Sequence, residues 1–222
     1  FGGEFILSND VTGGLVWVAA ATILLASLVA MTRDNLKARL AYSTVSQLSY
    51  IVLGAMLASK AGLIGATMHI AMHAFAKITL FFGAGAIMVA SHKKRVSELN
   101  GLGRAMPVTF AAFFIGTVSI IGLPPFGGMW SKWYLALGAV ETTQLLLLAV
   151  LMISSLLNII YLLPIPIRAF FSTPESGEHY TKIAEAPKSM LLAMIITSTA
   201  CVVLFFYPDP FYRLAGLAAG GY

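Results

Sequence analysis

Charge is what this sequence has least of. Only 10% of its 222 residues are Asp, Glu, Lys or Arg, whereas 59% are hydrophobic. Soluble domains contain about 25% charged residues, so the composition argues against a soluble protein. The mean hydropathy of +0.87 is that of a chain embedded in lipid. We therefore expect an integral, multi-pass membrane protein.

Side-chain sets that indicate covalent, redox or metal chemistry are also missing. The single cysteine, Cys201, cannot form an internal disulfide. The sequence contains no Cys/His cluster at metal-ligand spacing, no phosphate-binding loop and no nucleophile with a neighbouring base. We expect no cofactor, no metal and no catalytic residue on this chain, and whether it works inside a larger enzyme stays open.

Acidic residues are few, and none lies inside an apolar stretch. The nine fall in connections or at the ends of such stretches: Glu4, Asp10, Asp34, Glu98, Glu141, Glu175, Glu178, Glu185 and Asp209. Burial without a counter-ion favours the neutral form of an amine. A lysine inside the membrane could therefore take up and release a proton as a carboxylate approaches or leaves. That carboxylate would come from a missing part of the protein, from another subunit or from Glu141.

The sequence has neither an initiator methionine nor a signal peptide, and it begins with Phe1-Gly2-Gly3-Glu4. We expect it to be a fragment of a longer protein. No low-complexity linker divides it, so residues 1–222 are expected to form a single transmembrane domain.

Apolar stretches long enough to cross a bilayer are abundant. About 20 helical residues span the hydrocarbon core. Six stretches reach this length: Gly13–Met31, Leu40–Ala58, Ala61–Ala90, about Met106–Val140, about Thr143–Phe171 and Ser189–Tyr207. The expected fold is an all-α polytopic bundle of about six transmembrane helices.

Basic residues alternate between the two sides of this predicted bundle. Ten of them lie in connections on one side: Arg33, Lys37, Arg39, Lys93, Lys94, Arg95, Arg104, Arg168, Lys182 and Lys188. The opposite side has only Lys60 and Arg213. This asymmetry matches the positive-inside rule, so topology explains the net charge of +5 and nucleic-acid binding is not expected.

Three ionisable side chains, His69, His73 and Lys77, recur every fourth residue inside the third apolar stretch. Four helical residues rise about 6 Å, so the three side chains share one face over about 12 Å. A charged group at the bilayer centre costs at least about 2.5–3.5 kcal/mol, and such a row indicates a proton path. The alternative is that the histidines only hydrogen-bond to neighbouring helices.

The fourth apolar stretch is too long for one helix. Its roughly 35 residues would extend about 52 Å, against a hydrocarbon core of about 30 Å. Its centre contains helix-breaking residues: Gly122, Pro124, Pro125, Gly127 and Gly128. The prolines free the carbonyls of Ile120 and Ile121, and a break at this depth persists where protein or a water-filled cavity satisfies such groups.

Lys132 follows this break by four residues. Interrupted helices with a nearby charge recur in ion-coupled transporters. The alternative is a kink that only shapes packing, with Lys132 reaching the membrane interface between Trp130 and Trp133.

Two further helices carry polar faces. The second apolar stretch has one made of Ser43, Ser46, Gln47 and Tyr50. The fifth stretch has a weaker one made of Ser154, Ser155, Asn158 and Tyr161. We expect these groups to hydrogen-bond between helices, although hydroxyls can also hold a chain of water.

Three motifs, in order, resemble those of one family. They are Asp34–Gln47 (DNLKARLAYSTVSQ), His73–Lys77 (HAFAK) and Gly122–Lys132 (GLPPFGGMWSK). They resemble the antiporter-like family, which contains the proton-pumping membrane subunits of respiratory complex I, the A and D subunits of Mrp-type Na⁺/H⁺ antiporters, and subunits of membrane-bound hydrogenases. The sequence around Lys77 and Trp130–Tyr134 looks most similar to that of the Mrp D subunit.

The resemblance implies two inverted five-helix repeats, each with a broken helix. Residues 13–171 would be the second repeat and residues 189–207 an additional helix. By the same resemblance, Lys77 matches the lysine of the second half-channel and His69 and His73 match channel histidines. Lys132 matches a lysine on the broken helix, where some relatives carry glutamate. The first repeat, with its glutamate–lysine pair, is absent from this sequence.

We therefore predict a proton-translocating subunit of a multisubunit Na⁺/H⁺ antiporter, with protons passing along His69, His73 and Lys77 to Lys132. Its partners would be other membrane subunits, protons and Na⁺, in a bacterial or archaeal cell membrane. One alternative is a subunit of a complex I-like NADH:quinone oxidoreductase or of a membrane-bound hydrogenase. Another is a structural membrane scaffold.

Overall fold

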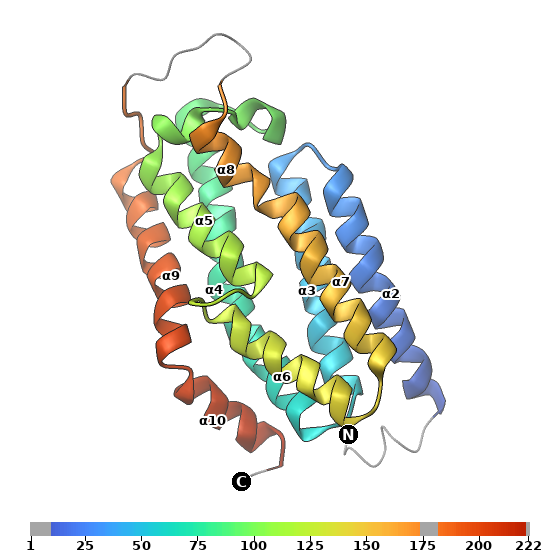
Figure 1. Cartoon of the computed structure of the whole chain (residues 1–222). Coiled ribbons are helices and arrows are strands. Elements are labelled where there is room, and N and C mark those ends of the chain that lie inside the picture. Colours follow the sequence, from blue (N-terminus) through green and yellow to red (C-terminus); the bar gives the residue numbers. More distant parts are fainter. Residues whose placement is uncertain (1–9, 174–181, 221–222) are drawn as a thin grey trace.

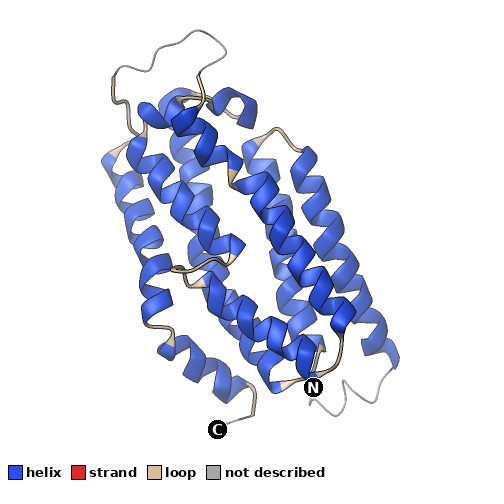
Figure 2. Cartoon of the chain, in the orientation of Figure 1, coloured by secondary structure: helices blue, strands red, loops and turns tan. Residues whose placement is uncertain are grey.

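The computed structural model describes residues 10–173 and 182–220, and the regular structure within them is helical (Figure 2). The helices are α2 (Asp10–Thr32), α3 (Leu36–Met56), α4 (Lys60–Ser91), α5 (Pro107–Ile121), α6 (Gly128–Glu141), α7 (Leu145–Leu162), α8 (Pro164–Phe171), α9 (Lys188–Phe206) and α10 (Asp209–Ala218). Two short 3₁₀ turns, η1 (Val96–Leu99) and η2 (Leu102–Arg104), connect α4 to α5. The expected all-α class is confirmed. Glu4, Glu175 and Glu178 lie outside the described residues.

Within the described residues, four helical segments are long and apolar enough to cross a membrane: Gly13–Thr32, Lys60–Ser91, Leu145–Phe171 and Lys188–Phe206. The other two expected crossings correspond to α3, which is 21 residues long but more polar, and to the α5–α6 pair. The polytopic membrane bundle is therefore confirmed, with α5 and α6 lying end to end beside the longer helices (Figure 1).

The predicted break divides the fourth apolar stretch into α5 and α6. The fifth apolar stretch is also divided, which was not expected. The predicted span 143–171 forms two helices, α7 and α8, which meet at Leu163. Pro164 and Pro166 explain the change of direction, because proline cannot donate the backbone hydrogen bond that would continue α7.

The basic connections meet at one end of the bundle, which we call the basic end. The connection before α3 pairs with the one after α4 through a bridge between Asn35 and Arg95. The Asp34 carboxylate accepts hydrogen bonds from the amide and the hydroxyl of Ser97, at 3.0 and 2.8 Å. The Gly101 amide donates to the Arg168 carbonyl at the end of α8. The alternation of basic connections predicted from the sequence is thus observed.

Helix α4 is the centre of the bundle, packed against α3, α5, α6, α9 and α10. Glycines bring α6 close to it. A Cβ atom on Gly65 would lie 2.5 Å from the Leu135 nitrogen, and one on Gly138 would lie 2.5 Å from the Gly62 nitrogen. Small residues at such crossings let helix backbones approach closely in membranes. The close approach sets the middle of α6, including Lys132, beside the ionisable face of α4.

Helix α10 was not predicted, because its ten residues are too few to cross a bilayer. It follows α9 at the end of the bundle opposite the basic end (Figure 1). Its Ala215 is buried against Ile64 and Met68 of α4, whereas Leu214 and Leu217 are exposed.

Candidate functional site

The ionisable row of α4 is buried along its whole length. His69, His73 and Lys77 are each less than a tenth exposed. The imidazole rings of His69 and His73 are stacked at an interplanar angle of 28°, with their centroids 5.7 Å apart. The predicted common face of these residues is therefore present inside the bundle and not on its surface.

Lys77 occupies the end of the row nearer the basic end. Its ammonium donates to the Ser43 hydroxyl of α3 at 2.6 Å. The same Ser43 oxygen accepts from the Tyr161 hydroxyl of α7 at 2.9 Å, and the Tyr161 hydroxyl also contacts the Asn158 side-chain oxygen. The polar faces of α3 and α7 thus meet at Lys77.

His69 occupies the other end of the row. Its Nδ1 lies 2.9 Å from the Ser131 hydroxyl of α6. That hydroxyl donates its own proton to the Gly128 carbonyl, at 3.0 Å, so we assign the Nδ1 proton to His69 as the donor. Nε2 of His69 is then a proton acceptor, and it is buried without a protein partner.

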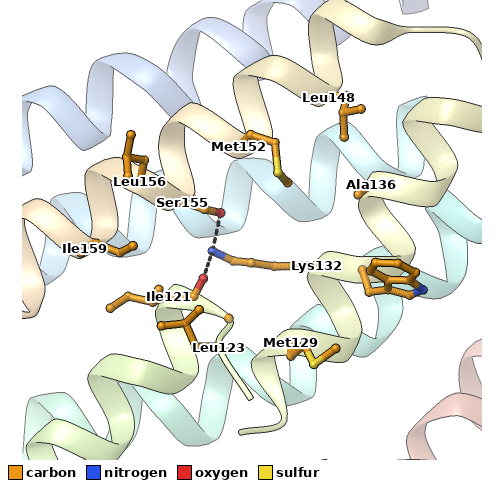
Figure 3. Close-up of a pocket in the computed structure, with 12 residues that line it drawn as sticks. Ile121, Leu123, Met129, Lys132, Ala136, Leu148, Met152, Ser155, Leu156 and Ile159 are labelled. Carbon is orange, nitrogen blue, oxygen red and sulfur yellow. Dashed lines mark hydrogen bonds between the residues drawn. The ribbon is translucent and has the colours of Figure 1, made fainter. Parts of the chain in front are cut away.

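Lys132 lies beside this end of the row. Its ammonium donates to the Ile121 carbonyl at 3.1 Å and to the Ser155 hydroxyl of α7 at 3.0 Å (Figure 3). It also lies 5.1 Å from the centre of the Tyr50 ring, which stacks on His69 at 5.7 Å. Lys132 therefore satisfies a carbonyl that the break frees. The Lys132 side chain is 8% exposed, whereas that of its neighbour Trp133 is 54% exposed. Lys132 therefore points into the bundle and does not extend to the membrane interface.

These contacts give a spatial order of the side chains that differs from the order predicted for the proton path. The sequence suggested that protons pass His69, His73 and Lys77 before reaching Lys132. Because α6 runs antiparallel to α4, Lys132 instead comes next to His69 through Tyr50 and Ser131. The histidines consequently lie between the two lysines.

The break itself is held from two sides. Gly122 ends α5 with a φ of +88°, and a Cβ there would lie 2.7 Å from Cδ of Lys132. A Cβ on Gly128 would lie 1.9 Å from the Ser119 carbonyl oxygen. On the other side, the Gly127 amide donates to the Cys201 carbonyl of α9 at 2.8 Å. Pro124 and Pro125, joined by a cis peptide bond, complete the segment.

The predicted polar lining has more than one role. Ser46 joins a cluster of hydroxyls with Ser27 and Ser154, at 2.9 and 3.4 Å, that ties α2, α3 and α7 together. This is the interhelical bonding expected of such residues. Gln47 differs, since it is fully buried with neither amide atom partnered by protein. Tyr50 pairs with His69 and Ser43 with Lys77, so the antiparallel register sets Gln47 opposite His73.

Two contributing residues, Ser27 and Ser131, were not singled out from the sequence. Ser131 precedes Lys132 directly and lies three residues after Gly128, which was the signal available for it. Ser27 sits in the middle of an apolar helix, where a lone hydroxyl more often bonds to its own backbone; here it does that with Ile23 and also reaches α3.

Neither ammonium has a carboxylate partner within the part of the chain that the structure describes. Lys77 contacts Ser43, and Lys132 contacts Ile121 and Ser155. Glu141, considered above as a partner, instead accepts from the Ala61 amide at the start of α4, at 3.4 Å. Among the described residues, no group of three His, Cys, Asp or Glu could hold a metal ion.

Comparison with known proteins places this arrangement among respiratory and antiporter membrane subunits. Residues 4–158 match the family model described as NADH:quinone oxidoreductase/Mrp antiporter, transmembrane. The chain is 38% identical over 205 residues to NADH-quinone oxidoreductase subunit N of Desulforudis audaxviator, covering 88% of this chain and 41% of that protein. It is 36% identical over 196 residues to subunit L of Mycobacterium tuberculosis, covering 85% of this chain and 30% of that protein.

The fold recurs in solved structures of membrane complexes. The Mrp complex from Dietzia sp. has a chain with a TM-score of 0.85 at 24% identity, covering 95% of this chain and 47% of that one. An archaeal membrane-bound sulfane sulfur reductase has a chain with a TM-score of 0.83 at 25% identity, covering 95% and 42%. The chain thus spans less than half the length of these relatives.

Proposed function

Because this chain belongs to the NADH:quinone oxidoreductase/Mrp antiporter transmembrane family, we propose that it translocates protons along the row that joins Lys77, His73, His69 and Lys132. The observation that carries the proposal is the burial of two lysines at the ends of a histidine pair, without carboxylate partners among the described residues. Ionisable groups held at this depth mark ion pathways, since their burial is costly.

The proton would move in short steps. Nε2 of His69 and Nε2 of His73 are buried without protein partners, so each can exchange a proton with water or with a neighbour after a ring rotation. The distance of 5.7 Å between the two ring centroids is longer than one hydrogen bond. Tyr50 and Ser131 bridge His69 to the surroundings of Lys132. A carboxylate from elsewhere in the protein or from another subunit would switch the lysines between their charged and neutral forms as it approaches or leaves.

A purely structural role for the row is the competing interpretation. It accounts well for Ser27, Ser46 and Ser154, whose hydroxyls bond to one another. It accounts poorly for Lys77, because a neutral side chain could make the single bond to Ser43 without the cost of a buried amine.

Replacement of Lys77 by alanine tests the proposal. We expect proton transport by the intact protein in vesicles, followed with a pH-sensitive dye, to fall by about 10²-fold or more, as for other positioned proton carriers. Lys94→Ala at the exposed basic end is the matched control and should leave transport unchanged. Undiminished transport by Lys77→Ala, with subunit content intact, would exclude the relay.

Two kinds of assembly fit this subunit. The fold likeness to the Mrp complex supports a cation/proton antiporter, which was the prediction from sequence. The names of the curated relatives, NADH-quinone oxidoreductase subunits N and L and hydrogenase-4 component B of Escherichia coli, support a redox-driven complex. Flavin and iron–sulfur signals in the purified complex would select the second, whereas Na⁺-dependent proton exchange by an all-membrane assembly would select the first.

A further inference from the structure

A groove with a volume of about 410 Å³ opens beside the break, between α6 and α7 (Figure 3). Its polar lining consists of Lys132 and Ser155, which bond to each other across it. The rest of the lining is apolar and includes Met152 and Leu156 of α7 and Trp133 of α6. The row on α4 does not use this space.

The groove is long, and most of its wall is apolar. Its lining on α7 extends from Leu148 to Ile159, a rise of about 16 Å. An extended hydrocarbon chain can lie along this apolar wall, with a polar head group at Lys132 and Ser155. Leu156 and Trp133 are more than half exposed, so the groove faces the surroundings of the bundle.

The Lys132 nitrogen lies at the floor of the groove without a carboxylate partner among the described residues. It bonds to the Ile121 carbonyl and the Ser155 hydroxyl, both neutral, and lies 5.1 Å from the centre of the Tyr50 ring. When this amine is protonated it has three N–H donors, so one donor and the charge remain for a ligand in the groove. Hydrogen bonds between an ammonium and a carboxylate are stronger than those between neutral groups, so a carboxylate ligand would stabilise the protonated form.

We propose that this groove binds a single-chain amphiphile with a carboxylate head group, a free fatty acid of the surrounding membrane. The carboxylate pairs with the Lys132 ammonium, and the hydrocarbon chain lies along α7 against Met152 and Leu156. The site shares Lys132 with the proposed proton path, but that path does not require the groove to be occupied.

The acid can reach this depth without carrying a charge through lipid. It enters as the neutral carboxylic acid; its O–H bond breaks, the proton bonds to the neutral Lys132 amine, and a carboxylate–ammonium pair results. The pair keeps the proton on Lys132. If the proposed function holds, the bound acid consequently inhibits transport.

Trp133 provides a direct probe of occupancy, because it lines the groove. The intact protein in lipid nanodiscs would be titrated with dibromostearic acid and with its methyl ester, whose bromine atoms quench indole fluorescence on contact. We expect saturable quenching by the acid at a concentration about tenfold lower than by the uncharged ester. Trp133→Phe should remove this component, and Trp17→Phe, on the exposed side of α2, should retain it.

Two variants distinguish the effect of the Lys132 charge on binding from the effect of the shape of the groove. Lys132→Gln should abolish the preference for the acid over the ester, and Ala136→Phe should narrow the groove and weaken both ligands with Lys132 unchanged. Equal, non-saturable quenching by acid and ester would overturn the proposal. So would a preference that survives in Lys132→Gln, or an absence of quenching because a protein side chain of the assembly fills the groove. Because quenching reports binding without transport, a failed relay leaves this test interpretable.

Discussion

Gly122 is the residue on which the position of Lys132 depends. Its φ of +88° lies in the left-handed region, and the Lys132 side chain passes where a Cβ atom would be, 2.7 Å from Cδ. Glycine is required here for two separate reasons, backbone conformation and space. The hydrogen bond from Lys132 to the Ile121 carbonyl forms across this point.

Gly122→Ala should therefore disturb both stability and transport. The left-handed backbone alone costs about 1–2 kcal/mol for an L-residue, and the new methyl group must displace Lys132. We expect a lower thermal unfolding temperature and reduced proton transport. Gly14→Ala is the control, since a Cβ there meets nothing within 4 Å, and alanine favours a helix by up to about 1 kcal/mol. A stable, active Gly122→Ala variant would show that Lys132 is not held by this contact.

At the scale of elements, the break between α5 and α6 is fixed largely by α9. The Gly127 amide bonds to the Cys201 carbonyl, and the Trp130 indole N–H bonds to the Phe205 carbonyl at 2.9 Å. Phe205 lies in the last turn of α9, where carbonyls have no partner within the helix. Carbonyl groups near the end of α9 thus accept hydrogen bonds from donors at the break and at the start of α6.

Trp130→Phe tests this contact while keeping most of the ring's packing against Phe205. Losing this partly buried hydrogen bond should lower the free energy of unfolding by about 0.5–1.5 kcal/mol. It should also speed hydrogen exchange of the amides around Gly127. Trp133→Phe, in the same helix but 54% exposed, should change neither quantity. Equal behaviour of the two variants would remove α9 as a support of the break.

The elements were largely predictable and their relations were not. Hydropathy located every helix that crosses the bundle, and the prolines located the break, because both effects are local. The order of Lys132 and His69 depends on the antiparallel packing of α6 on α4 through Gly65 and Gly138. Such a tertiary contact leaves no periodic signal, and the partnership of Trp130 with Phe205, 75 residues apart, is hidden for the same reason.

At the scale of the molecule, carboxylates join the connections of the basic end. Backbone hydrogen bonds from Arg95 and Lys94 hold the pKa of Glu98 below its ordinary 4.5. Burial tends to raise the pKa of Asp34, but hydrogen bonds from Ser97 and the charges of Arg39 and Arg95 lower it below 3.8 on balance. Both carboxyl groups are therefore more acidic in the folded protein.

The lowered pKa values of these two carboxyl groups determine how the stability of the folded protein changes with pH. A carboxyl group with a lowered folded-state pKa adds stability above its unfolded pKa and loses it as the pH falls through the folded value. We expect the contribution of the basic end to be complete above about pH 5 and to decline below about pH 4. Thermal unfolding temperatures measured from about pH 6 down to about pH 3 should show this decline, and the Asp34→Asn/Glu98→Gln double variant should flatten it. An unchanged slope in that variant would assign the effect to other groups.

The bonds from α9 to the break also bear on how such subunits can be recombined. The resemblance predicts a repeat that ends with residue 171, yet the carbonyls that hold its interrupted helix belong to residues 201 and 205. A chimera joined after Phe171 would pair one subunit's break with another subunit's α9. We expect a junction beyond Phe206 to preserve these bonds, so that the exchangeable unit would contain one more helix than the repeat that the resemblance predicts.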